Sequence, residues 1–166
     1  MPVKLEIYVD SSFANGIGRK SIYVFLIMIK KAVVHYKSKQ EPLVTQSSTE
    51  AEFVALSLTI KEVKWILSIL DEMCIPVSAA LIFCDNQGAI RIAYNKSSKG
   101  RTKHVDIRLQ AMKEAVLNGE VKVGYVQSGD NVSDIFTKPL GRLSFHKLRD
   151  QMLTKCQSIK GIAAKT

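Results

Sequence analysis

The sequence VKLEIYVD at residues 3–10 decides the fold class, because apolar side chains occupy every second position from Val3 to Val9. Successive side chains of a strand point to opposite faces of a sheet, so this alternation is typical of a strand with one buried face. Asp10 closes the stretch at the end of the predicted strand, on its polar face. The sequence therefore predicts a β-strand that carries an acid at its carboxyl end.

Further elements follow along the chain at spacings that suit one mixed sheet. Four more strands are predicted at residues 21–29, 32–36, 80–84 and 121–126, the first two joined by a hairpin at Lys30-Lys31. Helices are predicted from Ser47 to about Met73, from Asp85 to about Tyr94, from Val105 to Leu117, and over the region after residue 131 with a break at residues 139–141. This order predicts an α/β fold, a five-stranded mixed sheet flanked by helices.

Length and composition indicate one globular domain over residues 1–166, with a disordered tail from about residue 155. The 166 residues are 46% hydrophobic and 23% charged, which excludes disordered, collagen-like and disulfide-scaffold classes. The formal net charge of +9 favours a polyanionic partner, most often nucleic acid.

Hydropathy and cysteine content predict the cellular compartment of the chain. The longest unbroken apolar run, Ile22 to Ile29, is far shorter than the roughly 20 residues that span a bilayer. No basic leader with an apolar segment opens the sequence, so neither a membrane nor a secretory role is expected. The three cysteines are widely spaced and odd in number, which fits reduced thiols in an intracellular compartment.

The long helix carries a candidate functional acid in its first turn. Ser47 with Glu50, and Thr49 with Glu52, both satisfy the capping-box pattern that opens helices. Glu52 also continues the apolar stripe of the helix at steps of three and four, through Leu56, Ile60, Val63, Leu67 and Leu70. We therefore expect Glu52 to face the sheet, whereas Glu50 points elsewhere.

Four acids fall at the ends of predicted elements: Asp10, Glu52, Asp85 and Asp134. Carboxylates from several elements can hold hard divalent cations through oxygen and leave positions open for water and phosphate. Two such ions about 4 Å apart can hydrolyse a phosphodiester. The four acids together predict this kind of metal site.

Each acid also has a purely structural explanation. Asp85 precedes a helix and could cap it, Glu52 could complete the capping box with Thr49, and Asp134 suits the positive end of a helix dipole. Asp10 has the weakest explanation of this kind, because only an Asx-type turn with Ser11 would use it.

Several motifs resemble the ribonuclease H domain of copia-type LTR retrotransposon polyproteins, and they span almost the whole chain. The most specific are Ser48-Thr49-Glu50-Ala51-Glu52, Cys84-Asp85-Asn86-Gln87, Arg101-Thr102-Lys103-His104-Val105-Asp106-Ile107-Arg108 and Asp134-Ile135-Phe136-Thr137-Lys138-Pro139-Leu140. The resemblance implies the ribonuclease H-like fold and cleavage of the RNA strand of an RNA/DNA hybrid with two Mg²⁺ or Mn²⁺ ions.

The same resemblance implies roles and partners for this chain. The family's catalytic, metal-binding carboxylates fall on Asp10, Glu52, Asp85 and Asp134. The partners implied are the hybrid and the reverse transcriptase domain of the same polyprotein. A retrotransposon protein of this kind is expected in cytoplasmic virus-like particles or in the nucleus.

Departures from the family pattern leave two alternatives open. Ser12 and Phe13 stand where the family has a second acid and a Trp, and the hairpin around Lys30-Lys31 lacks the usual glycines. The first alternative is a degenerate, catalytically inactive remnant that only binds nucleic acid. The second is a strand transferase of the same fold superfamily, against which the Ser48–Glu52 and Cys84–Gln87 motifs argue.

Basic residues predict where nucleic acid binds. One cluster gathers Lys96, Lys99, Arg101, Lys103 and His104, and a second follows Asp134 with Lys138, Arg142, Lys147 and Arg149. Either group could follow a phosphate backbone, although basic clusters are also common on solvated faces. Phe53 and Trp65, in the long helix, are expected in the core.

Overall fold

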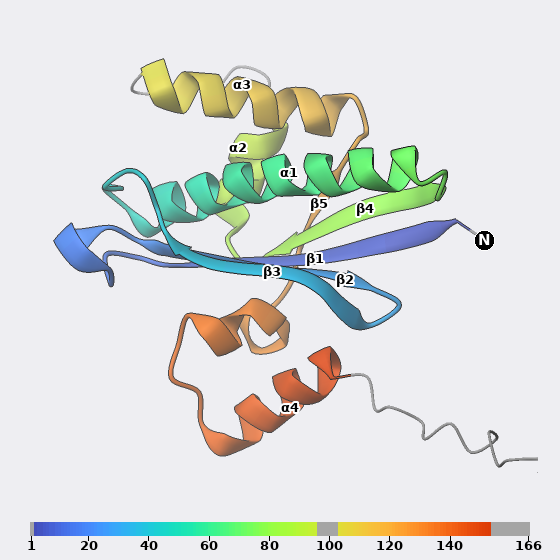
Figure 1. The fold of residues 1–166 in the computed structure, drawn as a ribbon. Coiled ribbons are helices and arrows are strands. Elements are labelled where there is room, and N and C mark those ends of the chain that lie inside the picture. The colour runs from blue at the N-terminus through green and yellow to red at the C-terminus, as the bar shows by residue number, and fades with distance from the viewer. Residues whose placement is uncertain (1, 96–102, 154–166) are drawn as a thin grey trace, which may run out of the picture.

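A five-stranded sheet in the order β3-β2-β1-β4-β5 forms the centre of the computed structural model, which describes residues 2–95 and 103–153 (Figure 1). The strands are β1 (Val3–Ser12), β2 (Ile22–Ile29), β3 (Ala32–Gln40), β4 (Val77–Cys84) and β5 (Lys122–Tyr125). β1, β2 and β3 pair antiparallel, whereas β4 runs parallel to β1 and β5 runs parallel to β4. The predicted mixed sheet and α/β class are confirmed.

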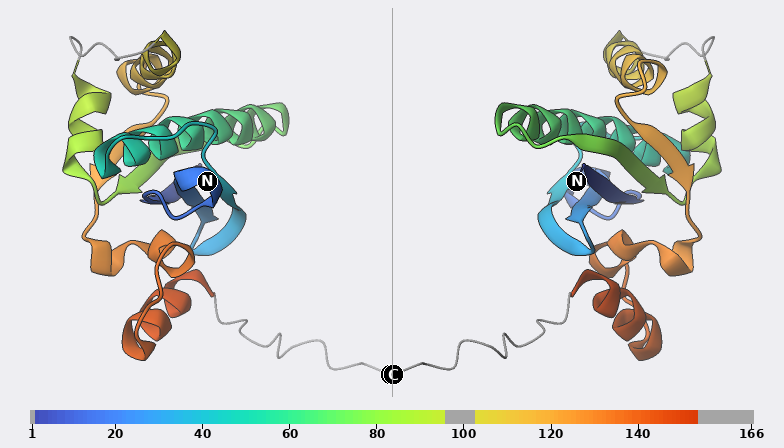
Figure 2. Two further views of the ribbon diagram at one scale, coloured as in Figure 1. Left: turned by 90° about the vertical axis from the view of Figure 1, so that its left-hand side faces the viewer. Right: turned by 90° about the vertical axis from the view of Figure 1, so that its right-hand side faces the viewer.

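Helices lie on both faces of this sheet (Figures 1 and 2). The α-helices are α1 (Ser48–Glu72), α2 (Gln87–Tyr94), α3 (Lys103–Leu117) and α4 (Arg142–Met152), and the short 3-10 helices are η1 (Ile17–Arg19), η2 (Ser128–Asp130) and η3 (Val132–Phe136). α1, α2 and α3 occupy one side, while η3 and α4 occupy the other. None of the helices in the described ranges is long and apolar enough to cross a membrane.

The main core lies between the sheet and α1. Leu5, Ile7 and Val9 are fully buried in β1, as the alternation predicts, and they pack in one cluster with Leu56 and Ile60 of α1. Burying this apolar surface is the main force that fixes α1 across the strands. The sheet and α1 therefore share one buried core, and Asp10 and Glu52 belong to these two elements.

Trp65 departs from its predicted place in the core. Its side chain is 55% exposed, whereas Phe53 in the same helix is buried as expected. The apolar stripe that includes Ile60 and Val63 already covers the sheet, and Trp65 lies beside it. The ring lies with its edge toward His35 of β3, with 6.2 Å between the ring centroids.

The β2–β3 connection is a two-residue hairpin at the predicted place. Ile29 pairs with Ala32, and Lys30 and Lys31 between them have φ angles of +49° and +65°. Positive φ at both central residues defines the type I′ turn, whose twist matches that of paired strands. The chain forms this turn without the Asn-Gly pair that favours it, and β3 continues to Gln40 beyond the predicted end at Tyr36.

The region after Asn131 differs from its prediction. Instead of a helix broken only at residues 139–141, the chain forms the short η3, and a regular α-helix begins only at Arg142. Short polar side chains compete with the helix for backbone hydrogen bonds, and Asn131 does so by accepting from the backbone N–H of Ser133. The tail predicted to be disordered from about residue 155 lies outside the described ranges.

Candidate metal centre

Three of the predicted acids meet where β1 and β4 end. The parallel register pairs Val9 with Cys84, so Asp10 of β1 and Asp85, the first residue after β4, follow side by side. η3 brings Asp134 to the same place, and one carboxylate oxygen from each of these three acids lies within 4.8 Å of the other two. Side chains that are far apart in sequence thus form one acidic cluster.

Glu52 lies on the α1 side of this cluster. One of its carboxylate oxygens is within 4.8 Å of an Asp85 oxygen, and the residue is buried. The backbone N–H of Ser11 donates to Glu52 Oε1 at 3.0 Å, which ties the helix to the end of β1. The structure therefore brings all four predicted acids together, as the stripe position of Glu52 indicated.

The start of α1 also decides between the two capping boxes. Ser47 is the N-cap and its side chain accepts from the backbone N–H of Glu50, while the Glu50 carboxylate accepts from the N–H of Gln46 at 2.7 Å. Glu52 makes its hydrogen bond to Ser11 instead, so the alternative capping role with Thr49 is wrong. The capping box of α1 therefore uses Glu50, and Glu52 faces the cluster.

Asp85 is not a helix cap either. Asn86 caps α2, since its side-chain oxygen accepts from the backbone N–H of Ala89 at 3.0 Å. The hydroxyl of Ser128 donates to Asp85 Oδ2 at 2.7 Å and orients the carboxylate. The structural explanation of Asp85 from sequence is therefore wrong, and its carboxylate is directed to the cluster.

Two residues that the sequence analysis did not single out hold η3 against β1. Asn131 is fully buried, and its side-chain amide donates to the carbonyl oxygen of Val9 at 3.0 Å. The hydroxyl of Thr137 donates to Asp10 Oδ2. The only sequence signal for Asn131 is that an Asn precedes a helical segment, which suits an N-cap. These contacts place Asp134 beside Asp10.

A ring contact anchors the same segment to the edge of the sheet. Phe136 of η3 stacks on Tyr36 of β3, with ring centroids 6.2 Å apart and an angle of 14° between the planes. Both rings are more than one-third exposed. The stack therefore connects η3, at the surface, to a strand far from it in sequence.

Lys138 points into the acidic cluster. Its Nζ lies 3.0 Å from Asp134 Oδ1, 3.5 Å from Asp10 Oδ2 and 3.9 Å from Asp85 Oδ2. The sequence analysis placed Lys138 in a basic cluster that follows phosphates. In the structure its ammonium instead lies within ion-pair distance of three carboxylates.

Crowding of buried acids changes their protonation. Burial, with the neighbouring charges of Asp10 and Asp85, raises the pKa of Glu52 to about 9. Burial and the charge of Asp10 raise the pKa of Asp134 to about 6, although the ammonium of Lys138 opposes this shift. Burial disfavours the charged form of Lys138, but the surrounding carboxylates outweigh it and raise its pKa.

The donor set fits hard divalent cations. Carboxylate oxygens are the ligands that Mg²⁺ and Mn²⁺ prefer. Cys84 also lies close, with Sγ 3.9 Å from Glu52 Oε2, but burial raises its thiol pKa to about 12 and keeps it protonated. A protonated thiol is a poor ligand, so the oxygen donors alone define the centre.

The structure describes the two predicted basic clusters only in part. Lys96, Lys99 and Arg101 fall outside the described residues, and Lys103 and His104 are the first residues of α3. Their role in nucleic-acid binding stays a prediction. In the second basic cluster, Lys147 pairs with Asp130 at 2.5 Å and Arg149 pairs with Asp150 at 2.7 Å.

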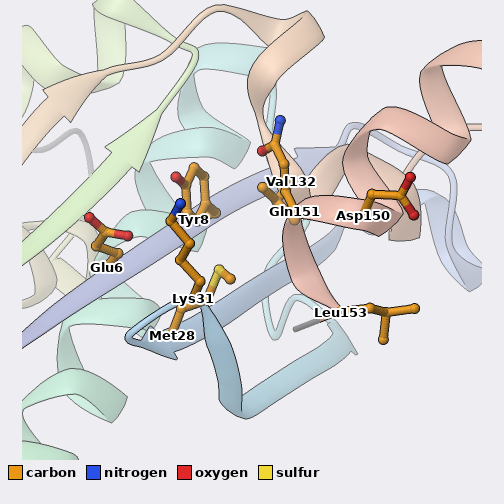
Figure 3. A pocket seen from close by; sticks show the side chains of 8 residues that line it. All are labelled: Glu6, Tyr8, Met28, Lys31, Val132, Asp150, Gln151 and Leu153. Carbon is orange, nitrogen blue, oxygen red and sulfur yellow. The ribbon is translucent and has the colours of Figure 1, made fainter. Parts of the chain in front are cut away.

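A pocket of about 550 Å³ lies elsewhere, between the strands β1 and β2 and the end of α4 (Figure 3). Tyr8, Lys31 and Asp150 are among the residues that line it. None of the four predicted acids does, so the pocket is separate from the candidate metal centre.

The chain is similar to segments of transposon-encoded polyproteins. It is 31% identical over 147 residues to the retrovirus-related Pol polyprotein from transposon TNT 1-94 of Nicotiana tabacum, covering 88% of this chain and 11% of the relative. It is 32% identical over 148 residues to the Pol polyprotein from transposon RE2 of Arabidopsis thaliana, covering 86% of this chain and 10% of the relative. The chain thus spans about a tenth of the length of these curated relatives.

Solved structures share the fold. The N-terminal RNase H domain of a Mycobacterium tuberculosis protein superposes with a TM-score of 0.53 at 12% identity, covering 89% of this chain and 96% of that one. LC11-RNase H1, solved in complex with an RNA/DNA hybrid, superposes with a TM-score of 0.53 at 14% identity, covering 76% and 88%. No established family profile matches the chain. At these identities the structural likeness concerns the fold.

Proposed function

The chain is a relative of the copia-type Pol polyproteins of plants and has the ribonuclease H fold, and from this premise we propose that it is a metal-dependent endonuclease. Its substrate would be the RNA strand of RNA/DNA hybrids formed during reverse transcription of a retrotransposon. The observation that carries the proposal is the convergence of Asp10, Asp85 and Asp134 within 4.8 Å, with Glu52 beside them. Sequence similarity to Pol polyproteins does not by itself show that these oxygen donors lie close together in this chain.

In this proposal Asp10, Glu52, Asp85 and Asp134 hold two Mg²⁺ or Mn²⁺ ions. Such ions activate the attacking water and stabilise the leaving oxygen of a phosphodiester. The protein fixes its donors in advance. The Ser11 N–H holds Glu52, the Ser128 hydroxyl holds Asp85, and the Thr137 hydroxyl holds Asp10. Preorganised ligands of this kind avoid a reorganisation cost when the substrate arrives.

The partners follow from charge and relatedness. A net charge of +9 attracts a polyanion toward the otherwise acidic centre. Contacts to 2′-hydroxyl groups would distinguish the RNA strand from DNA. A reverse transcriptase domain of the same polyprotein would supply the hybrid, in cytoplasmic virus-like particles or in the nucleus, because the relatives are Pol polyproteins.

A substrate panel tests the proposed function. Purified protein is incubated with end-labelled RNA/DNA hybrid, RNA duplex and DNA duplex, each with Mg²⁺, with Mn²⁺ and with EDTA. We expect cleavage of the RNA strand of the hybrid alone, and only with a divalent ion. Salt-sensitive hybrid binding by folded protein without any cleavage would favour the inactive remnant instead.

A further inference from the structure

Lys138 lies among the same carboxylates that the proposed function assigns to metal. Its Nζ is within 4.0 Å of one oxygen each from Asp10, Asp85 and Asp134, whose side chains are at most 11% exposed. Buried like charges at this spacing repel one another strongly. An ammonium among them supplies the compensating charge that a metal-free centre needs.

A metal ion and this ammonium need the same space. Mg²⁺ and Mn²⁺ bind carboxylate oxygens at little more than about 2 Å, so an ion shared by these acids must sit between their facing oxygens. The Lys138 Nζ already lies 3.0 to 3.9 Å from these oxygens, so an ion bound to them would lie against a like charge. Occupation by an ion therefore requires the ammonium to leave.

The Lys138 ammonium can leave the acids without any movement of the backbone. The Lys138 N–H donates to the carbonyl oxygen of Asp134 at 3.0 Å, which fixes the main chain at the end of η3. The side chain is 42% exposed and ends a flexible four-carbon stem. Rotation about the bonds of this stem can carry the ammonium away from the acids toward solvent.

We propose that Lys138 is a resident counter-ion that exchanges places with the metal. In the metal-free protein its ammonium is the counter-ion that Asp10, Asp85 and Asp134 share. Metal binding displaces it, and the displaced ammonium then contacts a backbone phosphate of the nucleic acid. This inference rests on the proposed function for the identity of metal and substrate. It predicts that metal and hybrid binding favour each other, because each removes the ammonium from the acids.

Metal affinity gives the first test. Mn²⁺ is titrated calorimetrically into wild type, Lys138→Met and Lys147→Met, the last replacing a lysine paired with Asp130 away from the cluster. Removal of a competing cation should tighten Mn²⁺ binding of Lys138→Met by about tenfold, a typical size for coupling between sites. Lys147→Met should bind as wild type does. Equal or weaker Mn²⁺ binding by Lys138→Met would overturn the exchange.

Amine labelling of the unmutated protein gives a second test that does not depend on how the variants fold. An amine-acylating reagent is applied with and without Mg²⁺, and the rate of modification at each lysine is measured by mass spectrometry. We expect Mg²⁺ to accelerate modification of Lys138 and to leave Lys147 unchanged. A Lys138 rate that Mg²⁺ does not raise would show that the ammonium stays in place.

Hybrid binding tests the phosphate contact and separates the inference from the proposed function. With Ca²⁺ in place of Mg²⁺, Lys138→Met should bind hybrid with a salt slope smaller by about one phosphate contact. Lys64→Met, which replaces a lysine paired with Glu120 outside both basic clusters, should bind with the wild-type slope. An unchanged slope in Lys138→Met would overturn the phosphate contact. Hydrolysis by wild type with unaltered metal affinity in Lys138→Met defeats only the counter-ion exchange. Absence of hydrolysis together with the predicted affinity change defeats only the nuclease.

Discussion

At the scale of single residues, the candidate centre depends on acids that the fold holds close together against their mutual repulsion. Glu52 shows this most clearly, because it is buried and faces the charges of Asp10 and Asp85. Hydrogen bonds from Ser11 and Thr137 hold the acids in position without removing the repulsion. Protonation, Lys138 or a divalent ion must therefore compensate the charge.

This repulsion predicts a pH-dependent stability of the metal-free protein. Glu52 has its pKa raised from 4.5 to about 9, so between these values the folded state keeps a proton that the unfolded state has lost. Stability should therefore fall as pH rises from about 5 to about 9. Urea unfolding in EDTA across this range measures it. In Glu52→Gln the free energy of unfolding should change less over this pH range. Glu120→Gln, which replaces a partly exposed acid paired with Lys64, should keep the wild-type pH dependence.

A fall in stability of equal slope in wild type and Glu52→Gln would contradict this account of Glu52. Mg²⁺ should act in the opposite direction. Metal ligands must be deprotonated, so the stabilisation that Mg²⁺ gives should grow over the same pH range.

Asn131 carries a second prediction at this scale. Asn131→Ala removes the donor to the Val9 carbonyl and the acceptor for Ser133, and we expect a loss of about 1–3 kcal/mol of unfolding free energy. Urea unfolding measures the loss, with exposed Asn118→Ala as the control, expected within about 0.5 kcal/mol of wild type. If Asn131→Ala were as stable as Asn118→Ala, the hydrogen bond between Asn131 and Val9 would not contribute to stability.

At the scale of elements, the site is assembled by short segments rather than by long ones. η3 carries Asp134, and the Asn131 link and the Tyr36–Phe136 stack tie the segment to β1 and β3. The sheet itself depends on the hairpin between β2 and β3, where Lys30 and Lys31 adopt positive φ. Left-handed backbone is unfavourable for residues with a side chain, so this turn is strained.

The hairpin offers a prediction with a built-in comparison. Lys30→Asn should stabilise the protein by about 0.5 kcal/mol, because Asn tolerates the left-handed region at the first position of a type I′ turn. Lys30→Val should destabilise it, since a β-branched side chain resists positive φ. The side chain of Lys30 is exposed, so both changes act mainly through the backbone. Thermal or urea midpoints in the reverse order would contradict the type I′ assignment.

At the scale of the whole molecule, the sequence could predict whatever follows from local periodicity. Alternation in residues 3–10 predicted β1, although the strand continues past Asp10 to Ser12. The helix stripe selected Glu52 over Glu50 as the acid that faces the cluster. Parallel pairing of β1 and β4 then brought Asp10 and Asp85 side by side. Periodicity and strand direction suffice for these features.

Other features depend on contacts between distant segments. The sequence could not show that the Asn131 amide meets Val9 or that the Lys138 ammonium lies among three acids, because both depend on how η3 packs. Trp65 was predicted in the core because an aromatic side chain in an amphipathic helix is usually buried, yet it lies beside the stripe. The same motifs that indicate the family carry no signal for these contacts.

The central claim is that the acidic cluster cuts RNA, and one gel assay tests it most directly. End-labelled RNA/DNA hybrid is incubated with Mg²⁺ and wild type, Asp85→Asn or Asp130→Asn, the last replacing an acid paired with Lys147 outside the cluster. Circular dichroism first establishes that all three proteins are folded. We predict metal-dependent cutting of the RNA strand by wild type and Asp130→Asn, and none by Asp85→Asn. Cutting by Asp85→Asn at the wild-type rate would contradict the account.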